Sequence, residues 1–397
     1  AYLGVLKAGA VAVLAPTQNE IDDLANILRA TAARLVLTTD EHAEWMSQAR
    51  TQRLVEQVVL THPQELLASA RQVAVPQAVG LHHFTRLLAG QSTAPPEIDV
   101  KPADLAAILY TSGTTGAAKG VMLSHRNLVA NSLQTLSWLH EANAGKERFL
   151  CALSFAHSYG LTSTLNLPLT LGATLILVPG FEVQRLLAAI QRHRPTIFPA
   201  VPALFVAINN VPNVRKYGIE SIKYCISGSA PLPVEVQEEF EKLTKGRLVE
   251  GYGLTEASPV THAEPLNGRR KGGSIGLPLP STEAKLFDLV DGERPVPRGQ
   301  IGELAVRGPQ VMLGYWQQPE ETAAILRPDG WLLTGDVAQD GPEGFFRIIA
   351  RKAEMWYPEW PGEPAFPRDV EEVLYEIPEV KEAAVVAIEN RPVAFLT

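Results

Sequence analysis

A segment rich in glycine and hydroxyl side chains, residues 110–120, has the composition of an anion-binding loop. It reads Tyr-Thr-Ser-Gly-Thr-Thr-Gly-Ala-Ala-Lys-Gly, with three glycines, four Ser or Thr hydroxyls and one lysine, Lys119. Glycines let backbone N–H groups approach an anion, hydroxyls donate to its oxygens, and lysine adds positive charge. The segment therefore predicts a polyphosphate-binding loop, with a solvated linker as the alternative. A Walker-type loop is excluded because that motif ends in Gly-Lys-Ser/Thr, whereas Lys119 follows Ala118 and precedes Gly120.

Short apolar runs that predict buried strands lead into this loop and into two others of similar composition. The three pairs of run and loop are residues 106–109 with 110–120, 222–226 with 227–231, and 247–250 with 251–256. Ligands of open α/β sheets collect beyond the carboxyl ends of the strands. The recurrence therefore predicts a ligand site at the carboxyl edge of a sheet.

The order of the other expected elements predicts an α/β protein. Residues 1–349 are expected to form a large N-terminal domain, in which α/β sheet subdomains precede a β-barrel-like subdomain that begins near Pro259. Residues 350–397 are expected to begin a small α+β C-terminal domain. Because residue 1 is not Met and an apolar run stops at Thr397, we expect a fragment that is incomplete at both ends.

Several individual elements are predicted by periodicity and capping residues. Ser124 is expected to cap a helix over residues 127–139, and Gly335-Asp336 is expected to close a strand over 331–334. Further expected helices are 21–29, 183–193 and 237–243, and further expected strands are 34–37, 54–60 and 383–388.

Composition narrows the classes of function. The 397 residues carry a formal net charge of −8 and contain no block of five or six basic residues, so nucleic acid is not an expected partner. No apolar run approaches the ~18 residues of a transmembrane segment, and no secretory signal is visible. Cys151 and Cys225 lie in apolar stretches, which predicts buried free thiols and a reducing, cytoplasmic location.

Four motifs, taken in order, resemble the signature motifs of the adenylate-forming superfamily, which comprises acyl-CoA synthetases, adenylation domains and luciferases. They are residues 110–120, Tyr252–Glu256, Thr334–Asp336 and the Arg351-Lys352 region. The resemblance covers essentially the whole chain, and residues 198–210 and 248–260 resemble bacterial long-chain fatty-acid–CoA ligases in particular. It implies activation of a carboxylic acid by ATP to an acyl-adenylate, followed by thioester formation with CoA and release of AMP and pyrophosphate.

The resemblance also implies a role for each motif residue. Thr255 and Glu256 are the expected catalytic residues: Thr255 donates to the α-phosphate, and Glu256 holds Mg²⁺, a hard cation that prefers oxygen ligands. Tyr252 offers a flat face to adenine, and Asp336 accepts from the ribose hydroxyls with help from Arg351. The full set of expected nucleotide-binding residues is Thr111, Ser112, Gly113, Thr114, Thr115, Gly116, Lys119, Gly228, Ser229, Ala230, Gly251, Tyr252, Gly253, Thr255, Asp336 and Arg351.

Each of these residues has a structural alternative when it is considered alone. Asp336 after Gly335 is typical of an ordinary turn, Glu256 of a cap, and Tyr252 of a core aromatic. Their occurrence together in the family's order favours the functional interpretation.

The expected substrate is a medium- or long-chain fatty acid. In amino-acid adenylation domains, the Asp of Phe-Asp-x-Ser pairs with the substrate ammonium, whereas the matching run here is Phe155-Ala156-His157-Ser158. A buried ammonium without a counter-ion is costly, which disfavours an amino acid. His157 matches the aromatic gate of acyl- and aryl-CoA ligases, although a lone His in an apolar stretch is more often a packing residue. The expected substrate-binding residues are His157, Tyr159, Val201, Ser227, Gly228 and Gly251.

The expected partners are therefore small molecules, namely the fatty acid, ATP with Mg²⁺, and CoA. Peripheral contact with a membrane and a homodimer both stay open. Transfer of the acyl group to a carrier protein rather than to free CoA cannot be separated by sequence.

The hinge region departs from the family pattern. The family motif reads Gly/Asp-Arg-x-Lys/Asp, whereas Ala350 and Ala353 occupy its outer positions. Residues 356–364, with several Pro and Trp, replace the usual Gly-rich segment and would stiffen the connection. The family's adenylation lysine, near the end of the small domain, has no match before Thr397. These departures keep a second alternative open, a non-catalytic nucleotide- or acyl-binding relic.

Overall fold

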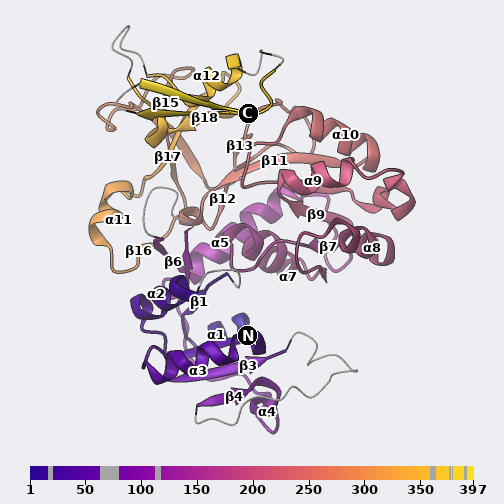
Figure 1. The fold of residues 1–397 in the computed structure, drawn as a ribbon, viewed down its shortest axis with the longest axis vertical. Coiled ribbons are helices and arrows are strands. Elements are labelled where there is room, and N and C mark those ends of the chain that lie inside the picture. Colours follow the sequence, from indigo (N-terminus) through magenta and orange to yellow (C-terminus); the bar gives the residue numbers. More distant parts are fainter. Residues whose placement is uncertain are drawn as a thin grey trace. The chain divides into compact units, whose positions relative to one another are not determined.

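The structure of the chain is a computed structural model (Figure 1). It describes residues 1–16, 21–62, 80–111, 118–357, 364–374, 377, 379–388 and 391–397. These residues form two compact units, Ala1–Gly120 and Val121–Thr397, which are described separately.

Parallel strands and short helices make up the first unit. The strands are β1 (Ala12–Leu14) paired with β5 (Leu105–Tyr110), and β2 (Leu35–Thr39), β3 (Gln57–Thr61) and β4 (Leu81–His83) in a second sheet. The helices are α1 (Tyr2–Lys7), α2 (Ile21–Thr31), α3 (Ala43–Thr51) and α4 (Phe84–Leu88). Met46 of α3 is buried with Val58 and Leu60 of β3. The expected strand before the phosphate loop is β5, and Ala106–Leu109 within it are buried.

A seven-stranded, mainly parallel sheet lies at the centre of the described second unit, in the order β13-β12-β11-β10-β9-β7-β8. β7 to β11 pair in parallel, and β12 and β13 add antiparallel strands at one edge. The strands are β7 (Arg148–Cys151), β8 (Thr174–Leu177), β9 (Ile197–Ala200), β10 (Tyr224–Ser227), β11 (Arg247–Gly253), β12 (Val260–Ala263) and β13 (Leu277–Pro278).

Helices cover both faces of this sheet because apolar side chains point alternately to its two sides. Phe198 and Cys225 pack with α8 (Val183–His193), α9 (Pro202–Asn209) and α10 (Val234–Thr244) on one face. The neighbouring residues Ile197 and Ile226 pack with Leu167 on the other face. That face carries α5 (His125–Trp138), α6 (Ser158–Leu161), a π-helical turn (Thr162–Asn166) and α7 (Leu167–Thr170).

Antiparallel strands dominate the remainder of the second unit. β14 (Glu283–Phe287), β15 (Ile301–Arg307), β17 (Leu332–Asp340) and β18 (Phe346–Arg351) form a sheet in that order. β6 (Gly120–Ser124) pairs with β16 (Gly314–Tyr315), which precedes α11 (Pro319–Ile325). Near the C-terminus, α12 (Pro367–Leu374) precedes the antiparallel pair β19 (Ala383–Ile388) and β20 (Arg391–Leu396). The mixed α/β architecture is the predicted fold class.

The predicted helix cap at Ser124 is confirmed. Ser124 Oγ accepts a hydrogen bond from the N–H of Asn127 at 3.2 Å, and Asn127 Oδ1 accepts one from the N–H of Ser124 at 2.8 Å. This reciprocal pair satisfies backbone donors that have no partner within the first turn, so α5 begins at His125.

The predicted end of a strand at Gly335-Asp336 is wrong. β17 continues to Asp340, and its pairing with β15 passes from Glu303 opposite Val337 to Ala305 opposite Leu333. Leu304 alone therefore faces residues 334–336, which form a β-bulge rather than a terminating turn.

Both cysteines are free and buried, as their apolar surroundings predict. Burial raises the pKa of the Cys151 thiol to about 12, so this thiol is protonated at neutral pH. In the parts of the chain that the structure describes, no helix combines the length and apolar composition needed to cross a membrane.

Replacement of Phe205 tests the packing of α9 on the central sheet. Phe205 is fully buried and makes edge-to-face contacts with Phe198 and Phe240, at centroid distances of 5.5 and 4.9 Å. We expect Phe205→Ala to lower the free energy of unfolding by about 3–5 kcal/mol, because it leaves a cavity. The same change at Phe181, whose side chain is 58% exposed, is the matched control. Equal urea midpoints for the two variants would contradict this assignment of the core.

Candidate active site

Close packing requires glycine in the loop that follows β10 and at the end of β11. A Cβ atom on Gly228 would lie 3.2 Å from two ring atoms of Tyr159, and one on Gly253 would overlap the carbonyl oxygen of Pro259. Tyr159 is fixed in place because its hydroxyl donates to the carbonyl oxygen of Ile226 at 2.6 Å. The glycines expected from the loop composition therefore have a steric basis.

A cleft of about 1530 Å³ opens beyond the carboxyl end of β11. Its walls come from the loop after β10, the end of β11, the β17–β18 pair, and parts of α12 and β19. The expected nucleotide-binding residues that line it are Ser229, Ala230, Gly251, Tyr252, Gly253, Asp336 and Arg351.

Asp336 is the centre of the interactions in this cleft. Its side chain is only 6% exposed; Arg351 Nη1 lies 3.0 Å from Oδ1, and the Tyr252 hydroxyl donates to Oδ2. Asp336 and Arg351 lie directly opposite each other on β17 and β18. Burial raises the pKa of the Asp336 carboxyl, while Arg351 and the Tyr252 hydrogen bond act in the opposite direction. Each carboxylate oxygen keeps a further lone pair for a ligand hydroxyl.

The ring of Tyr252 packs against a row of two further aromatic side chains, His262 and Phe346. It contacts His262 edge-to-face at 5.9 Å between centroids, and His262 contacts Phe346 in the same way at 5.0 Å. Burial lowers the pKa of His262 to about 3, so its imidazole is neutral at pH 7. This support leaves Tyr252 on the wall of the cleft with its position fixed.

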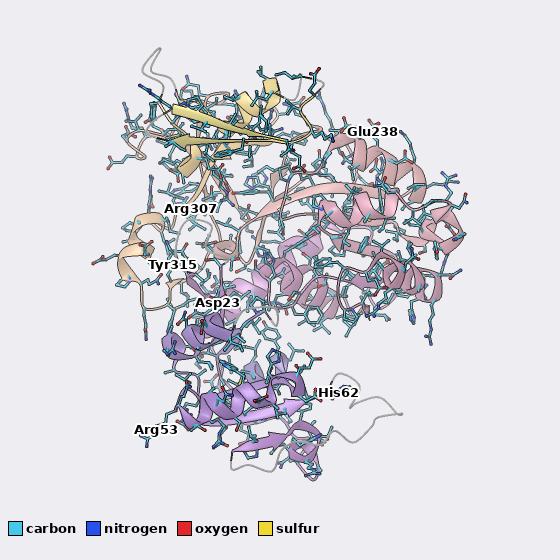
Figure 2. The ribbon with its side chains drawn as sticks, viewed as in Figure 1. Asp23, Arg53, His62, Glu238, Arg307 and Tyr315 are labelled. Atoms are coloured by element: carbon cyan, nitrogen blue, oxygen red, sulfur yellow. The ribbon has the colours of Figure 1, made fainter. Side chains whose placement is uncertain are left out.

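Thr255 and Glu256 lie in a short 3₁₀ turn after β11, Thr255–Ala257. Thr255 Oγ1 is 3.1 Å from the hydroxyl of Ser158. Glu256 Oε1 accepts a hydrogen bond of 2.7 Å from the hydroxyl of Tyr315 on β16, a residue that Figure 2 labels. Burial, and then the nearby Glu256 charge, raise the pKa of Tyr315, so its hydroxyl stays protonated and able to donate. Both candidate catalytic side chains are therefore oriented by hydroxyl partners.

Glu256 fits a Mg²⁺ ion whose other ligands are phosphate oxygens of the bound nucleotide and water. Among the described residues, no group of three or more His, Cys, Asp or Glu side chains could enclose a metal. Magnesium in nucleotide sites is commonly held by one or two carboxylates together with phosphate oxygens and water. Glu256, whose Oε1 is positioned by Tyr315, is a suitable single carboxylate.

The expected substrate-binding residues gather around Tyr159. The N–H of Tyr159 donates to Nδ1 of His157 at 3.2 Å, and burial lowers the pKa of that imidazole, which favours the neutral form. The Tyr159 hydroxyl lies next to the carbonyl oxygens of Ala200 and Ile226, which directly precede Val201 and Ser227. Ser227 is fully buried, and its Oγ has no hydrogen-bond partner in the described part of the chain.

The predicted phosphate loop is described only at its ends. The N–H of Thr111 donates to the carbonyl oxygen of Lys119 at 3.0 Å, and the N–H of Lys119 lies 3.3 Å from Thr111 Oγ1, so the two ends of the loop lie together. The loop residues Ser112, Gly113, Thr114, Thr115 and Gly116 lie outside the described residues. Residues 358–363 of the Pro- and Trp-rich segment also lie outside them.

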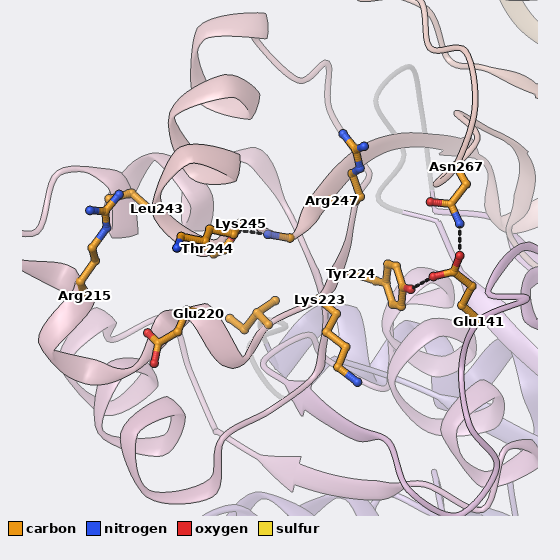
Figure 3. Close-up of a pocket in the computed structure, with 12 residues that line it drawn as sticks. Glu141, Arg215, Glu220, Lys223, Tyr224, Leu243, Thr244, Lys245, Arg247 and Asn267 are labelled. Carbon is orange, nitrogen blue, oxygen red and sulfur yellow. Dashed lines mark hydrogen bonds between the residues drawn. The ribbon is translucent and has the colours of Figure 1, made fainter.

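A second pocket, of about 620 Å³, lies at the amino ends of β10 and β11 and contains none of the predicted site residues (Figure 3). Tyr224 and Asn267 both donate to Glu141 there. The charged ends of Lys223 and Arg247 point away from each other, so they do not converge on one ligand. The candidate active site is therefore the cleft at the opposite, carboxyl end of the strands.

The sequence did not predict the positioning roles of two residues in the site, Tyr315 and Ser158. Tyr315 meets Glu256, 59 positions earlier, and Ser158 meets Thr255, 97 positions later. Nothing in the local sequence of Tyr315 distinguishes it from a core aromatic. Ser158 stood in the motif that begins at Phe155, but its partner was not predictable.

Comparisons with known proteins identify the family of the chain. Residues 1–316 match the AMP-binding enzyme family. The long-chain-fatty-acid–CoA ligase of Bacillus subtilis (strain 168) is 40% identical over 402 residues, which cover 98% of this chain and 71% of that protein. The 4-coumarate–CoA ligase 2 of Nicotiana tabacum is 30% identical over 414 residues, which cover 100% and 72%. The crystal structure of ATP-bound MatB from Rhodopseudomonas palustris has a TM-score of 0.87 and 29% identity, and covers 100% of this chain and 74% of that chain.

The family match spans most of the chain, and the relatives align with nearly all of it. The chain therefore belongs to the AMP-binding enzyme family, the adenylate-forming acyl- and aryl-CoA ligases.

Proposed function

We propose that this protein activates a medium- or long-chain fatty acid with ATP and transfers the acyl group to CoA. The observation that carries the proposal is the meeting of Tyr252, Asp336 and Arg351 on the wall of the cleft beyond β11. Similarity to the Bacillus ligase over 98% of the chain supports a fatty acid as the substrate. Ala156 supports the same choice, because an ammonium group would have no counter-ion at that position.

In the proposed first step, a carboxylate oxygen of the fatty acid attacks the α-phosphorus of ATP. The bond from that phosphorus to the bridging oxygen breaks, and pyrophosphate leaves. Because both reactants are anions, the site must hold them in line and neutralise charge. Thr255, held by Ser158, donates to the α-phosphate, and Glu256 would hold Mg²⁺, which would neutralise phosphate charge. The β- and γ-phosphates are assigned to the loop residues Thr111, Ser112, Thr114, Thr115 and Lys119.

The nucleoside is held on the wall of the cleft. The Asp336 carboxylate accepts from ribose hydroxyls, and the adenine lies against the ring of Tyr252. Gly228, Ser229 and Ala230 bring backbone close to the base. In the second step, the thiol of CoA releases its proton to solvent and its sulfur attacks the acyl carbonyl carbon. The bond from that carbon to the phosphate oxygen breaks, and AMP leaves.

Two further assignments belong to this proposal. A boundary between the large and small domains at residues 349/350 falls within β18. A cytoplasmic location is supported by the two buried free thiols, Cys151 and Cys225.

A non-catalytic nucleotide-binding role is the second candidate, and one observation favours it. Ala353 lies in a 3₁₀ turn, Lys352–Glu354, on the wall of the cleft, at the position where the family pattern has a charged hinge residue. An uncharged residue there would affect domain rotation rather than nucleotide binding, so this candidate predicts ATP binding without turnover.

The choice of substrate is tested by incubating the protein with ATP, Mg²⁺, CoA and a panel of fatty, aryl and amino acids. We expect AMP to form with medium- or long-chain fatty acids and acyl-CoA to accumulate in equal amount. Amino-acid-dependent exchange of pyrophosphate would overturn the proposal. ATP binding without AMP formation from any acid would favour the non-catalytic candidate.

Replacement of Glu256 tests the metal and phosphate assignment. We expect Glu256→Gln to weaken Mg·ATP binding at least about tenfold, equivalent to ~1.4 kcal/mol, because a charged oxygen ligand is lost. Glu141→Gln is the matched control, since Glu141 also accepts from a tyrosine hydroxyl but lies in the remote pocket. Titration calorimetry measures both. An unchanged affinity for Mg·ATP in Glu256→Gln would count against the assignment.

A further inference from the structure

A buried carboxylate, Glu303 on β15, lies between the Asp336 bulge and the end of β18. Its side chain is 5% exposed, and each of its oxygens has a partner. Oε1 accepts a hydrogen bond from the N–H of Gly335 at 3.2 Å, and Oε2 lies 2.6 Å from Nζ of Lys352. Glu303 therefore links the residue before Asp336 to the residue after Arg351.

The bulge explains why Gly335 depends on this carboxylate. Residues 334–336 face only Leu304, so their backbone groups cannot all join the regular ladder between β15 and β17. The Thr334 hydroxyl donates to the carbonyl oxygen of Leu304 at 2.8 Å and accepts from the N–H of Asp336 at 3.1 Å. Gly335 adopts φ +73°, and its N–H is donated to Glu303. Side chains thus supply the partners that the strand ladder would otherwise provide.

Two ion pairs of different exposure lie next to each other at this point. Asp336 with Arg351 is one, and Glu303 with Lys352 is the other. The Arg351 side chain is 58% exposed, so it is free to change its partner when a ligand enters the cleft. The Lys352 side chain is 31% exposed and contacts a carboxylate that solvent barely reaches, so loss of this pair would leave a buried charge uncompensated.

From this arrangement we infer that Glu303 is a positioning residue for nucleotide binding. Glu303 fixes the position of the Gly335 amide relative to Lys352. Asp336 therefore keeps its orientation while Arg351 turns from Asp336 to the ligand. Glu303 does not itself line the cleft, so it acts through the bulge and not by contact with the nucleotide. The inference rests on the proposed role of Asp336 in holding the ribose.

The chemistry of the pair predicts an asymmetry between its two members. In Glu303→Gln, the amide oxygen still accepts from Gly335, and the released Lys352 can extend into solvent. In Lys352→Met, the buried Glu303 carboxylate loses its counter-ion, which is the more costly change. In the double variant both charges are absent, so its defect should be smaller than the two single defects combined.

The test is a double-variant cycle on the full chain, with the dissociation constant of Mg·ATP as the main measurement. We expect Glu303→Gln to weaken Mg·ATP binding about fivefold and Lys352→Met about twentyfold, with the double variant less affected than the product of the two. Lys352→Arg, which keeps the cation, should stay within about threefold of the unchanged protein. The KM for the acid should change less than twofold in every variant.

Glu283→Gln provides the matched control. Glu283 pairs with Arg307 across β14 and β15 of the same sheet, at 2.8 Å, and both side chains are partly exposed. Figure 2 labels Arg307. Removal of this pair should leave Mg·ATP binding unchanged.

The outcomes separate this inference from the proposed function. If Glu303→Gln and Lys352→Met lower the melting temperature but bind Mg·ATP as the unchanged protein does, Glu303 is only a structural residue and the inference is overturned. If ATP binding weakens as expected but no fatty acid is activated, the inference stands and the choice of substrate fails.

Discussion

The buried carboxylate of Asp336 is the interaction on which the candidate site depends. It accepts from Tyr252 at the end of the parallel sheet and pairs with Arg351 on the antiparallel sheet, so one side chain joins two differently built parts of the second unit. A carboxylate with so little solvent needs these partners to remain charged. The partners also have fixed positions, because Tyr252 packs against His262 and Arg351 belongs to β18. The folding of the two sheets and the shape of the cleft are therefore coupled.

Local patterns in the sequence predicted those features that depend on neighbouring residues. The Ser124 cap follows from contacts within one turn, the helix over residues 183–193 follows from apolar residues at helical spacing, and both are present. The end of a strand at Gly335 was wrong because Gly-Asp is typical of turns, and the same residues also suit a bulge between paired strands. Tyr315 could not be predicted, since its role depends on a partner far away in the sequence.

The resemblance carried more functional information than composition did, and the structure explains why. Tyrosine donates to glutamate in two places, from Tyr315 to Glu256 and from Tyr224 to Glu141. The local chemistry is the same, but one pair lies after the carboxyl end of β11 and the other at the amino ends of the strands. Position in the sheet, rather than the kind of contact, distinguishes a candidate catalytic pair from a surface pair. The short apolar run before residues 251–256 predicted that position, and the order of the motifs along the chain pointed to the same site.

The bulge in β17 also has a consequence for how this strand can vary in length. Between the pairs Glu303–Val337 and Ala305–Leu333, three residues of β17 face one residue of β15, so β17 carries two extra residues. Because successive side chains of a strand point to opposite faces, an insertion of two residues leaves Leu333 and Val337 on the same face of the sheet. Loss of one residue from the bulge would move every side chain on one side of the bulge to the opposite face of the sheet. Loss of two residues would preserve the apolar face and remove only the segment that carries Asp336. Parity thus lets this strand gain or lose its ligand-binding segment as a unit while the sheet keeps its inner and outer faces.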